Sequence, residues 1–309
     1  IIPDASSRLA ALRTAEIDHL RQVGDEDAEL LRTQVPALKE ARFPLEPYGL
    51  NLRVDKPELP WYDKKVRQAL MMALDRDTIV RDYYRGRAEK YNYPVAAFPV
   101  WKGIGAYVPF EQLPANVREL FEYNPDKARQ MLADAGYPNG FNMELVIESI
   151  PERIDEATIV RQQFAKVGVE LELQPKESGT FNSISVGMGH QHAIWNTVEG
   201  SFIADWEYVR PGAPDNRAGV NDPYATAQSD EFSKYYIVDD DKAYPIIANF
   251  VPYALDQAWY IQFPTPYTYT MWWPWVQNYG GEWCIGVAAV WGFAKYVWID
   301  GGLKQSMGY

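Results

Sequence analysis

Residues 142–174 decide the fold class, and they read NMELVIESIPERIDEATIVRQQFAKVGVELELQ. Apolar and polar side chains alternate through most of 142–148, which is the two-residue period of a strand. A helical pattern over 154–167 ends at Gly168, and the alternation then resumes at Val169. A strand, a helix and a strand joined by short connections form a βαβ unit, whose two strands must be parallel. The stretch therefore predicts an α/β fold.

The segments before this unit predict further helices. Residues 63–74 carry the strongest helical pattern of the chain, with Asp63 in place as the N-cap. Asp75 is placed to cap a short helix that ends at Gly86, where a left-handed backbone costs little. Asn124, followed by a proline, combines a good N-cap with a first helical residue that needs no N–H. These helices fit an α/β body.

The remaining patterns are shorter. They predict helices over 6–17, 25–34 and 244–254, strands over 45–54, 183–186 and 193–196, and an ordered loop over 91–114. The acidic run 239–241 indicates the solvated start of a helix. Near the C-terminal end of the sequence, alternation places Tyr269 and Met271 on the same strand face as Trp273. We expect core packing for this aromatic cluster.

The composition describes a packed protein with an acidic surface. The chain has 309 residues, of which 47% are hydrophobic and 23% charged, so a disordered or fibrous protein is excluded. Acidic side chains outnumber basic ones by 42 to 30, which gives a formal net charge of −12. Such a charge repels phosphate backbones, so we expect no nucleic-acid partner. The apolar residues 284–294 fall short of the about 20 residues that span a bilayer, so we expect no membrane insertion.

Metal ligands are few in this sequence. The single Cys284 cannot form an intrachain disulfide or a thiolate cluster. His190 and His192 lie two residues apart, a spacing that on a strand points both rings to one side and supplies two metal ligands. No third donor accompanies them, so we expect a hydrogen-bonded or solvent-facing pair, and neither a metal nor a cofactor. We expect His19 on a helix surface.

Several segments taken together resemble one protein family. They are ALRTAEID at 11–18, VRQALMMALDR at 66–76, NPDKA at 124–128, LADAGY at 132–137, the helix 159–168, WPWVQNY at 273–279 and WID at 298–300. In this order, over nearly the whole chain, they resemble hallmarks of the bacterial extracellular solute-binding proteins, family 5. Proteins of this kind serve peptide- and nickel-type ABC importers.

The resemblance implies a periplasmic-binding-protein-like type II fold, an α/β clamp whose two lobes are joined by two crossover strands. Full-length relatives are longer, and the first matching segment lies late in their first lobe, so we expect this chain to be a C-terminal portion. Residues 1–53 would then be a remnant of lobe I, 54–262 lobe II and 263–309 a return to lobe I. Part of the ligand-contacting wall would lie outside the chain.

The same resemblance implies the substrate-binding component of an ABC importer. It would be a periplasmic monomer that encloses a small solute by closure of its lobes and delivers it to permease subunits in the membrane. No catalytic residue is implied, and the common hydrolase, zinc-protease, P-loop and dinucleotide motifs do not occur. An oligopeptide or dipeptide is the first expected ligand, and an oligosaccharide or other non-peptide is the alternative. A glycoside hydrolase, which needs two carboxylates at a set separation, is the alternative from another class.

The resemblance points to one acidic ligand-binding residue. In peptide-binding relatives a carboxylate just after a tryptophan-containing strand holds the α-ammonium of the ligand, and the nearest match here is Asp205. A carboxylate in a dehydrated cleft forms a strong charge-assisted hydrogen bond with ammonium. The following residues 209–211 read VRP instead of the usual Asp-Pro, which keeps a non-peptide ligand open.

Five further residues are candidates for ligand contact or for ordinary packing. Trp195, Trp206 and Tyr208 would form apolar plates along a cleft, with core packing as the alternative for each. Arg210 and Arg217 would clamp a carboxylate with two hydrogen bonds, with pairing to some of the many acidic residues as the alternative. All five residues lie in the predicted lobe II. Trp195 is on the predicted strand 193–196, and the other four follow it in residues 206–217.

Overall fold

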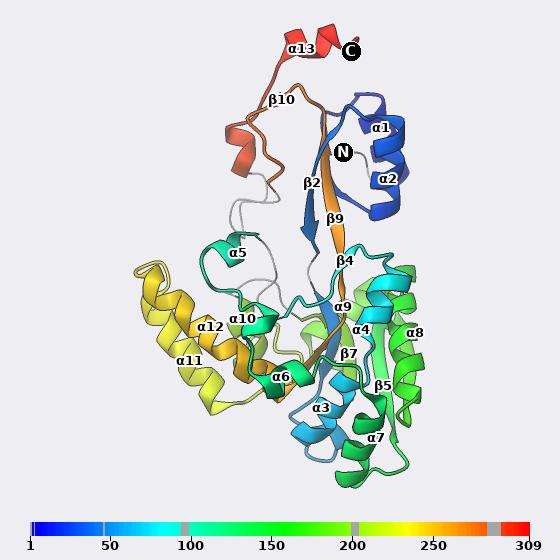
Figure 1. Ribbon diagram of the computed structural model, residues 1–309, viewed down its shortest axis with the longest axis vertical. Coiled ribbons are helices and arrows are strands. Elements are labelled where there is room, and N and C mark those ends of the chain that lie inside the picture. Colours follow the sequence, from blue (N-terminus) through cyan, green and yellow to red (C-terminus); the bar gives the residue numbers. More distant parts are fainter. Residues whose placement is uncertain (1, 3, 46, 94–98, 199–203, 283–291) are drawn as a thin grey trace. The chain divides into compact units, whose positions relative to one another are not determined.

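The computed structural model describes residues 2, 4–45, 47–93, 99–198, 204–282 and 292–309 (Figure 1). The chain forms two compact units, one made of Ile1–Leu45 with Pro266–Tyr309 and the other of Glu46–Thr265. The chain therefore passes between the units twice, once in each direction. Each unit has a hydrophobic core of its own.

The second unit is built on a five-stranded sheet with the order β6-β5-β7-β3-β8. Its strands are β3 (Tyr48–Leu52), β5 (Phe141–Glu148), β6 (Val169–Lys176), β7 (Ala193–Thr197) and β8 (Tyr260–Gln262). β5 is parallel to β6 and β7, while β3 is antiparallel to β7 and β8. Helix α8 (Pro151–Ala165) connects β5 to β6, so the predicted βαβ unit is confirmed.

A glycine stands immediately before each of the two parallel strands of this βαβ unit. Gly140 precedes β5 with a φ of 73°, and Gly168 precedes β6 with a φ of 85°. A Cβ atom on Gly140 would lie 1.7 Å from the carbonyl oxygen of Gly168. The backbones of the two strand entries therefore approach each other more closely than any side chain allows, and both positions also favour glycine by conformation.

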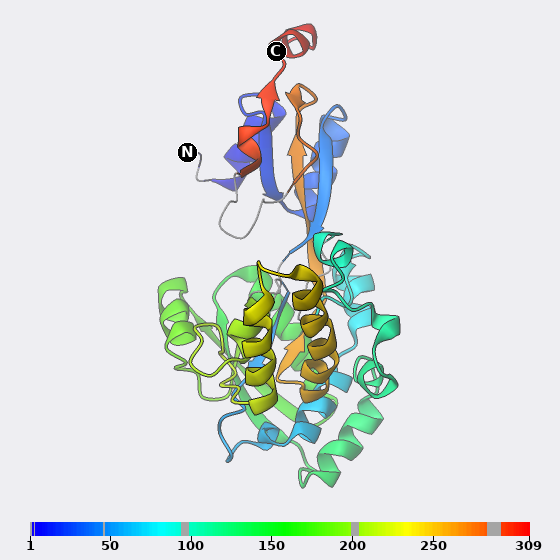
Figure 2. The same ribbon diagram turned by 90° about the vertical axis from the view of Figure 1, so that its left-hand side faces the viewer.

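Helices cover both faces of the sheet. They are α3 (Lys64–Met72), α7 (Pro125–Asp134), α8, α9 (Ser178–Val186), α11 (Pro223–Tyr235) and α12 (Asp240–Gln257). On one face Leu145 of β5 shares the main core with Phe164 of α8, and on the other Phe181 of α9 packs with Val146 and Ile194. Figure 2 shows α11 and α12 side by side. The alternation along β5 thus places successive side chains in different layers.

The predicted helix starts of this unit are confirmed. Asp63 caps α3 by accepting from the backbone of Lys65 at 2.8 Å, and Asp75 caps a short helix by accepting from Thr78 N at 3.0 Å. Asn124 caps α7 in the same way. The smaller elements are 3₁₀ turns at Pro60–Tyr62 and Phe110–Gln112, α4 (Arg76–Thr78), a π-helical turn at Ile79–Tyr83, β4 (Ala88–Glu89), α5 (Pro99–Gly103), α6 (Ala115–Glu119) and α10 (Ala204–Val209).

The first unit combines segments from both ends of the chain. Its elements are α1 (Ala5–Arg13), β1 (His19–Val23), α2 (Asp25–Gln34), β2 (Lys39–Pro44), β9 (Thr265–Trp272), β10 (Val276–Gln277), a 3₁₀ turn at Gly292–Lys295, β11 (Trp298–Ile299) and α13 (Gly301–Ser306). β9 lies between β1 and β2 and is antiparallel to both. The core contains Tyr269, Met271 and Trp273, which confirms the expected packing of this aromatic cluster.

Several expectations from the sequence are wrong. Residues 183–186 belong to α9 and not to a strand, because Glu177 caps a helix there by accepting from Gly179 N at 2.9 Å. His19 lies on β1, not on a helix surface, and its Nε2 is 3.0 Å from Tyr279 Oη. The helix expected over 244–254 is present, but its limits differ, since α12 is longer and continues through both Pro245 and Pro252.

The unit boundaries also differ in position from the predicted domain limits. The chain passes between units at 45/46 and 265/266, whereas the sequence suggested 53/54 and 262/263. The difference at the first boundary arises because β3 pairs with β7 and β8 and so belongs to the sheet of the second unit. The assignment of the units to lobes of a longer protein stays a prediction. Among the described residues, no helix has both the length and the apolar character that a bilayer span requires.

Candidate functional site

The carboxyl ends of the parallel strands share one edge of the five-stranded sheet. β5 ends at Glu148, β6 at Lys176 and β7 at Thr197. In open α/β sheets ligands bind outside these strand ends. Tyr48, the first residue of β3, is paired with Thr197, and β8, which is antiparallel to β3 and so runs in the same direction as β7, ends at Gln262 on the same side. We call this the carboxyl edge and take it as the candidate site, since both connections to the first unit also leave from it.

A buried carboxylate lies close to the carboxyl edge. Glu156 of α8 is 3% exposed and accepts hydrogen bonds from Tyr84 Oη at 2.8 Å and from Arg153 Nη1 at 2.7 Å. The indole N–H of Trp195 donates a third hydrogen bond at 3.2 Å. Burial, reinforced by the charge of Glu156, raises the pKa of Tyr84 well above its ordinary value, so the tyrosine stays a donor. Three donors offset the cost of burying the charge.

Arg153 connects this carboxylate to the start of β3. Its guanidinium carbon lies 3.5 Å from the centroid of the Tyr48 ring, a cation–π contact. Burial is the largest single influence and lowers the pKa of Arg153, but the attraction and hydrogen bond of Glu156, together with the attraction of Tyr48 and Tyr84, outweigh burial, so the net shift is upward. The residue therefore stays cationic. We call Glu156, Arg153, Tyr84, Trp195 and Tyr48 the Glu156 cluster; it ties α8, β7 and the start of β3 together.

A second polar cluster lies at the end of β7. The hydroxyl of Tyr208 is 2.7 Å from Thr197 Oγ1, and Arg217 Nη1 donates to the same hydroxyl at 3.4 Å. Arg217 also donates to Ser185 Oγ at 2.8 Å and forms an ion pair with Asp215 at 2.5 Å. Pairing with an acidic residue, the alternative raised for Arg217, is therefore what the structure shows. We call Tyr208, Thr197, Arg217, Ser185 and Asp215 the Tyr208 cluster. It anchors the end of α10 at the carboxyl edge.

The three predicted aromatic residues are buried within the second unit. Trp195 packs edge-on against Phe263 with ring centroids 5.4 Å apart, and Trp206 lies 4.9 Å from Phe250. Trp195, Trp206 and Tyr208 are 1%, 4% and 5% exposed. This placement fits the core-packing alternative for the two tryptophans. Tyr208 differs in that its hydroxyl reaches Thr197, the last residue of β7, at the carboxyl edge. Ligand contact by the three residues stays a prediction.

The other two predicted site residues lie on or just after α10. Arg210 is exposed, and its Nη2 lies 3.9 Å from Asp230 Oδ1, which fits the surface-pairing alternative. Asp205 lies three residues before Tyr208 on α10, and its side chain is outside the described part of the structure. The structure thus places the backbone of Asp205 near a residue of the carboxyl edge. Its role as a ligand contact stays a prediction.

Both members of the histidine pair are hydrogen-bonded, as expected, but they do not have the strand geometry that would point the two rings to one side. His190 and His192 precede β7 and are not on a strand. His190 Nε2 donates to the carbonyl of Arg217 at 2.9 Å, whereas His192 Nδ1 accepts from the backbone N–H of Glu144 at 3.0 Å. The two rings therefore bond to different segments. Among the described residues there is no group of three or more His, Cys, Asp or Glu that could hold a metal ion.

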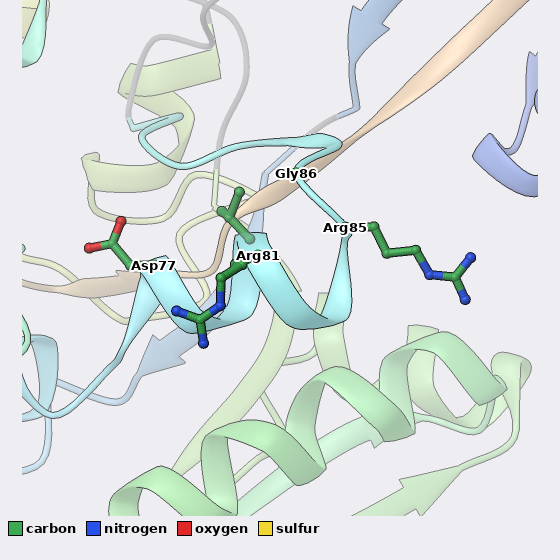
Figure 3. A pocket seen from close by; sticks show the side chains of 5 residues that line it. Asp77, Arg81, Arg85 and Gly86 are labelled. Carbon is green, nitrogen blue, oxygen red and sulfur yellow. The ribbon is translucent and has the colours of Figure 1, made fainter.

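A hollow lies on the surface near the π-helical turn (Figure 3). It has a volume of about 690 Å³ and is lined by Asp77, Val80, Arg81, Arg85 and Gly86. Its charged side chains extend in different directions in Figure 3. Asp77 is bound by Lys90 at 2.5 Å and Arg81 by Asp82 at 2.6 Å. Because these groups do not converge on one point, we assign the hollow no ligand.

No pattern in the sequence indicates the Glu156 cluster as a whole. Arg153 and Glu156 lie three residues apart on α8, a spacing at which a helical cation and carboxylate can meet, so that part of the signal was present. Tyr84 and Trp195 come from distant parts of the chain. No local pattern indicates that they share a carboxylate.

A sheet with a carboxyl edge of this kind, linked by two connections to another α/β unit, is the architecture of type II periplasmic binding proteins. Residues 1–216 match the family model described as bacterial extracellular solute-binding proteins, family 5 Middle. The chain belongs to this family. The resemblance found in the sequence and the predicted α/β fold are both confirmed.

Individual relatives agree with this family. Heme-binding protein A from Haemophilus influenzae is 29% identical over 180 residues, which are 55% of this chain and 29% of that protein. The oligopeptide-binding protein AppA from Bacillus subtilis is 31% identical over 193 residues, 56% of this chain and 32% of that protein. The solved structure of HbpA2 from Haemophilus parasuis aligns with a TM-score of 0.69 and 26% identity over 90% of this chain and 54% of that one. This chain therefore spans about half of the solved relative.

Proposed function

We propose that this protein is the substrate-binding component of an ABC importer, and that its solute is an oligopeptide or dipeptide. The match of residues 1–216 to the family model carries this proposal. The name of AppA, a relative, supports a peptide as the first ligand class. The protein works outside the cytoplasmic membrane, encloses the solute by closure of its lobes and passes it to permease subunits. It acts as a monomer and catalyses no reaction.

Within the proposal, Asp205 binds the α-ammonium of the peptide. Two observations support this part of the chain as the binding segment. Tyr208, one helical turn later, reaches Thr197 at the carboxyl edge, and its carbonyl accepts a hydrogen bond from Tyr260 Oη. The C-terminal half of α10 is therefore held in place before any solute arrives, and such preorganisation reduces the entropy that binding costs. Trp195, Trp206 and Arg210 are the further proposed contacts.

The ligand class is tested by calorimetry on the full-length protein. We expect heat of binding with a pool of dipeptides and tripeptides and none with a pool of oligosaccharides. Chromatography of the oligosaccharide pool after incubation checks for hydrolysis. Binding of oligosaccharide without product would move the ligand to the non-peptide class, and product formation would replace the proposal by a glycosidase.

The ammonium contact is tested by a matched pair of variants. Asp205→Ala removes the proposed partner, and Glu207→Ala removes an equal charge from the same helix. A hydrogen bond to a charged group contributes about 1.5–3 kcal/mol, so we expect Asp205→Ala to weaken peptide binding by about tenfold to a hundredfold. Glu207→Ala should leave the affinity within about twofold. Equal effects of the two variants would show that Asp205 is not the ammonium partner.

A further inference from the structure

The loop between α11 and α12 exposes two neighbouring aliphatic side chains. Ile237 is 81% exposed and Val238 is 82% exposed, more than any other large hydrophobic residue among the described ones. Both lie at the turn of the helix hairpin, at one end of the two adjacent helices in Figure 2. We call residues 236–239 the hairpin tip. Exposure of this apolar surface costs solubility and contributes nothing to the core.

The backbone conformation of the tip does not explain these residues either. Ile237 has a φ of 70°, in the left-handed region where glycine and asparagine are favoured. A β-branched side chain is strained there, since its Cβ crowds the neighbouring carbonyl. Folding alone would therefore favour a different residue at this position. A residue that is both strained and exposed points to a role outside the fold.

The hairpin tip is held rigidly in spite of its exposure. The backbone N–H groups of Val238 and Asp239 both donate to the carbonyl of Tyr235, at 2.8 and 2.7 Å. The ring of Tyr236 stacks on Phe232 with centroids 5.2 Å apart. Two aliphatic side chains are thus presented in a fixed arrangement. Contact with a partner would cost little ordering entropy.

The surroundings of the tip are acidic. Residues 230–242 contain five acidic residues, which are Asp230, Glu231 and the run 239–241, and two lysines; with Arg210, which lies 3.9 Å from Asp230, the formal charge of this surface is 3 − 5 = −2. Lys234 is paired with Glu231 at 2.5 Å and Lys242 with Asp239 at 2.6 Å. A complementary partner surface would therefore be basic around an apolar centre.

We propose that the hairpin tip docks onto the permease of the importer, with Ile237 and Val238 entering an apolar pocket that is rimmed by basic side chains. This inference rests on the proposed transport function and names the surface that serves it. Charge decides between a protein and a lipid as the occupant. The net negative charge of the surface around the tip is repelled by anionic headgroups, whereas a basic protein rim attracts it.

The test uses the full-length protein and the permease complex reconstituted in phosphatidylcholine nanodiscs, with affinity measured by biolayer interferometry. The variant Ile237→Asn/Val238→Ser removes the apolar surface and places at 237 a residue that tolerates the left-handed conformation. Val186→Ser is the matched control, since Val186 is 71% exposed at the end of α9. We expect the double variant to lose at least tenfold in permease affinity, with unchanged solute binding and an unchanged or higher melting temperature. The control should bind like the wild type.

Each contrary outcome is specific. Equal permease affinity of the wild type and the double variant, or an equal loss in Val186→Ser, overturns the docking inference alone. Binding of the wild type to empty nanodiscs at the same affinity assigns the tip to lipid and also overturns it. A wild type that binds neither solute nor permease overturns the proposed function itself. If the double variant does not fold, Val238→Ser alone replaces it under the same criteria.

Discussion

The two units of this molecule obtain their cores in opposite ways. In the second unit β5, α8 and β6 follow one another directly, and the two strands pair in parallel. In the first unit β9 pairs with strands from the other end of the chain, so that Met271 lies opposite Leu20. The second unit also buries a charge, Glu156, whereas the first relies on large aromatic side chains. The contrast shows that one chain contains both a locally encoded βαβ unit and a sheet whose central strand comes from the far end of the sequence.

The aromatic core of the first unit gives the largest expected effect. Trp273 is 1% exposed, stacks on Trp275 at 4.5 Å and donates from its indole N–H to the carbonyl of Leu12 at 2.8 Å. Trp273→Ala should lower the free energy of unfolding of this unit by about 3–5 kcal/mol. Hydrogen exchange should therefore accelerate in 4–45 and 266–282 and stay slow in 141–176.

The control for this variant is Trp298→Ala, because Trp298 lies in the same unit but is 56% exposed. Its effect should stay within about 0.5 kcal/mol. If Trp273→Ala accelerated exchange equally in both units, their cores would be one cooperative body and the contrast between the two units would fail.

The buried charge of the second unit gives the next effect. Glu156→Gln keeps the shape but removes the charge that binds Arg153, Tyr84 and Trp195, so we expect a loss of about 2–3 kcal/mol in that unit. Urea unfolding monitored by hydrogen exchange measures it. Because the loss comes mainly from leaving Arg153 without its partner, Arg153→Met combined with Glu156→Gln should recover part of it. A double variant less stable than Glu156→Gln would contradict the ion-pair explanation.

The smallest effect is a dependence on pH. Burial, with a further contribution from Arg53, lowers the pKa of His190 from its ordinary value of 6.5 to about 4. Between these values the unfolded chain binds a proton that the folded chain does not, so the stabilisation is complete above pH 6.5 and declines as the pH falls towards 4. From pH 7 to pH 5 we expect a loss of about 2 kcal/mol in the second unit.

NMR titration of the imidazole signals checks this dependence directly. Each unit contains a comparable histidine, since burial first and Arg21 second lower the pKa of His19 in the first unit to about 4 as well. Both rings should stay neutral at pH 5.5. If the imidazole of His190 titrated near pH 6.5, its ring would be solvated below that pH, and its buried environment would exist only above it.

The locally encoded parts of the fold were predictable from the sequence. The alternation over 142–148, the cap at Asp63 and the cap at Asn124 each depend on neighbouring residues, and each is confirmed. The run 183–186 failed because short apolar stretches fit a strand and a helix equally well, and the cap at Glu177 decides for the helix. The continuity of α12 through Pro245 also could not be predicted, since its packing in the core outweighs local propensity.

The candidate site likewise has one part that the sequence indicates and one part that it does not. The resemblance led to the α10 segment, and the structure places Tyr208 of that segment on the carboxyl edge. The Glu156 cluster brings together groups that are 39 residues apart between Glu156 and Trp195 and 72 residues apart between Tyr84 and Glu156. Periodicity over a few turns contains no information about such partners. Only the three-dimensional arrangement reveals them.

The central place of β9 has a consequence for synthesis on the ribosome. The strands β1 and β2 emerge early, yet the strand that must lie between them is translated only after the whole second unit. The second unit is contiguous and can therefore mature first, while the early segment waits with two unsatisfied strand edges. During that interval those nascent edges are open to wrong partners, and a holdase or an export factor that shields them would raise the yield of native protein.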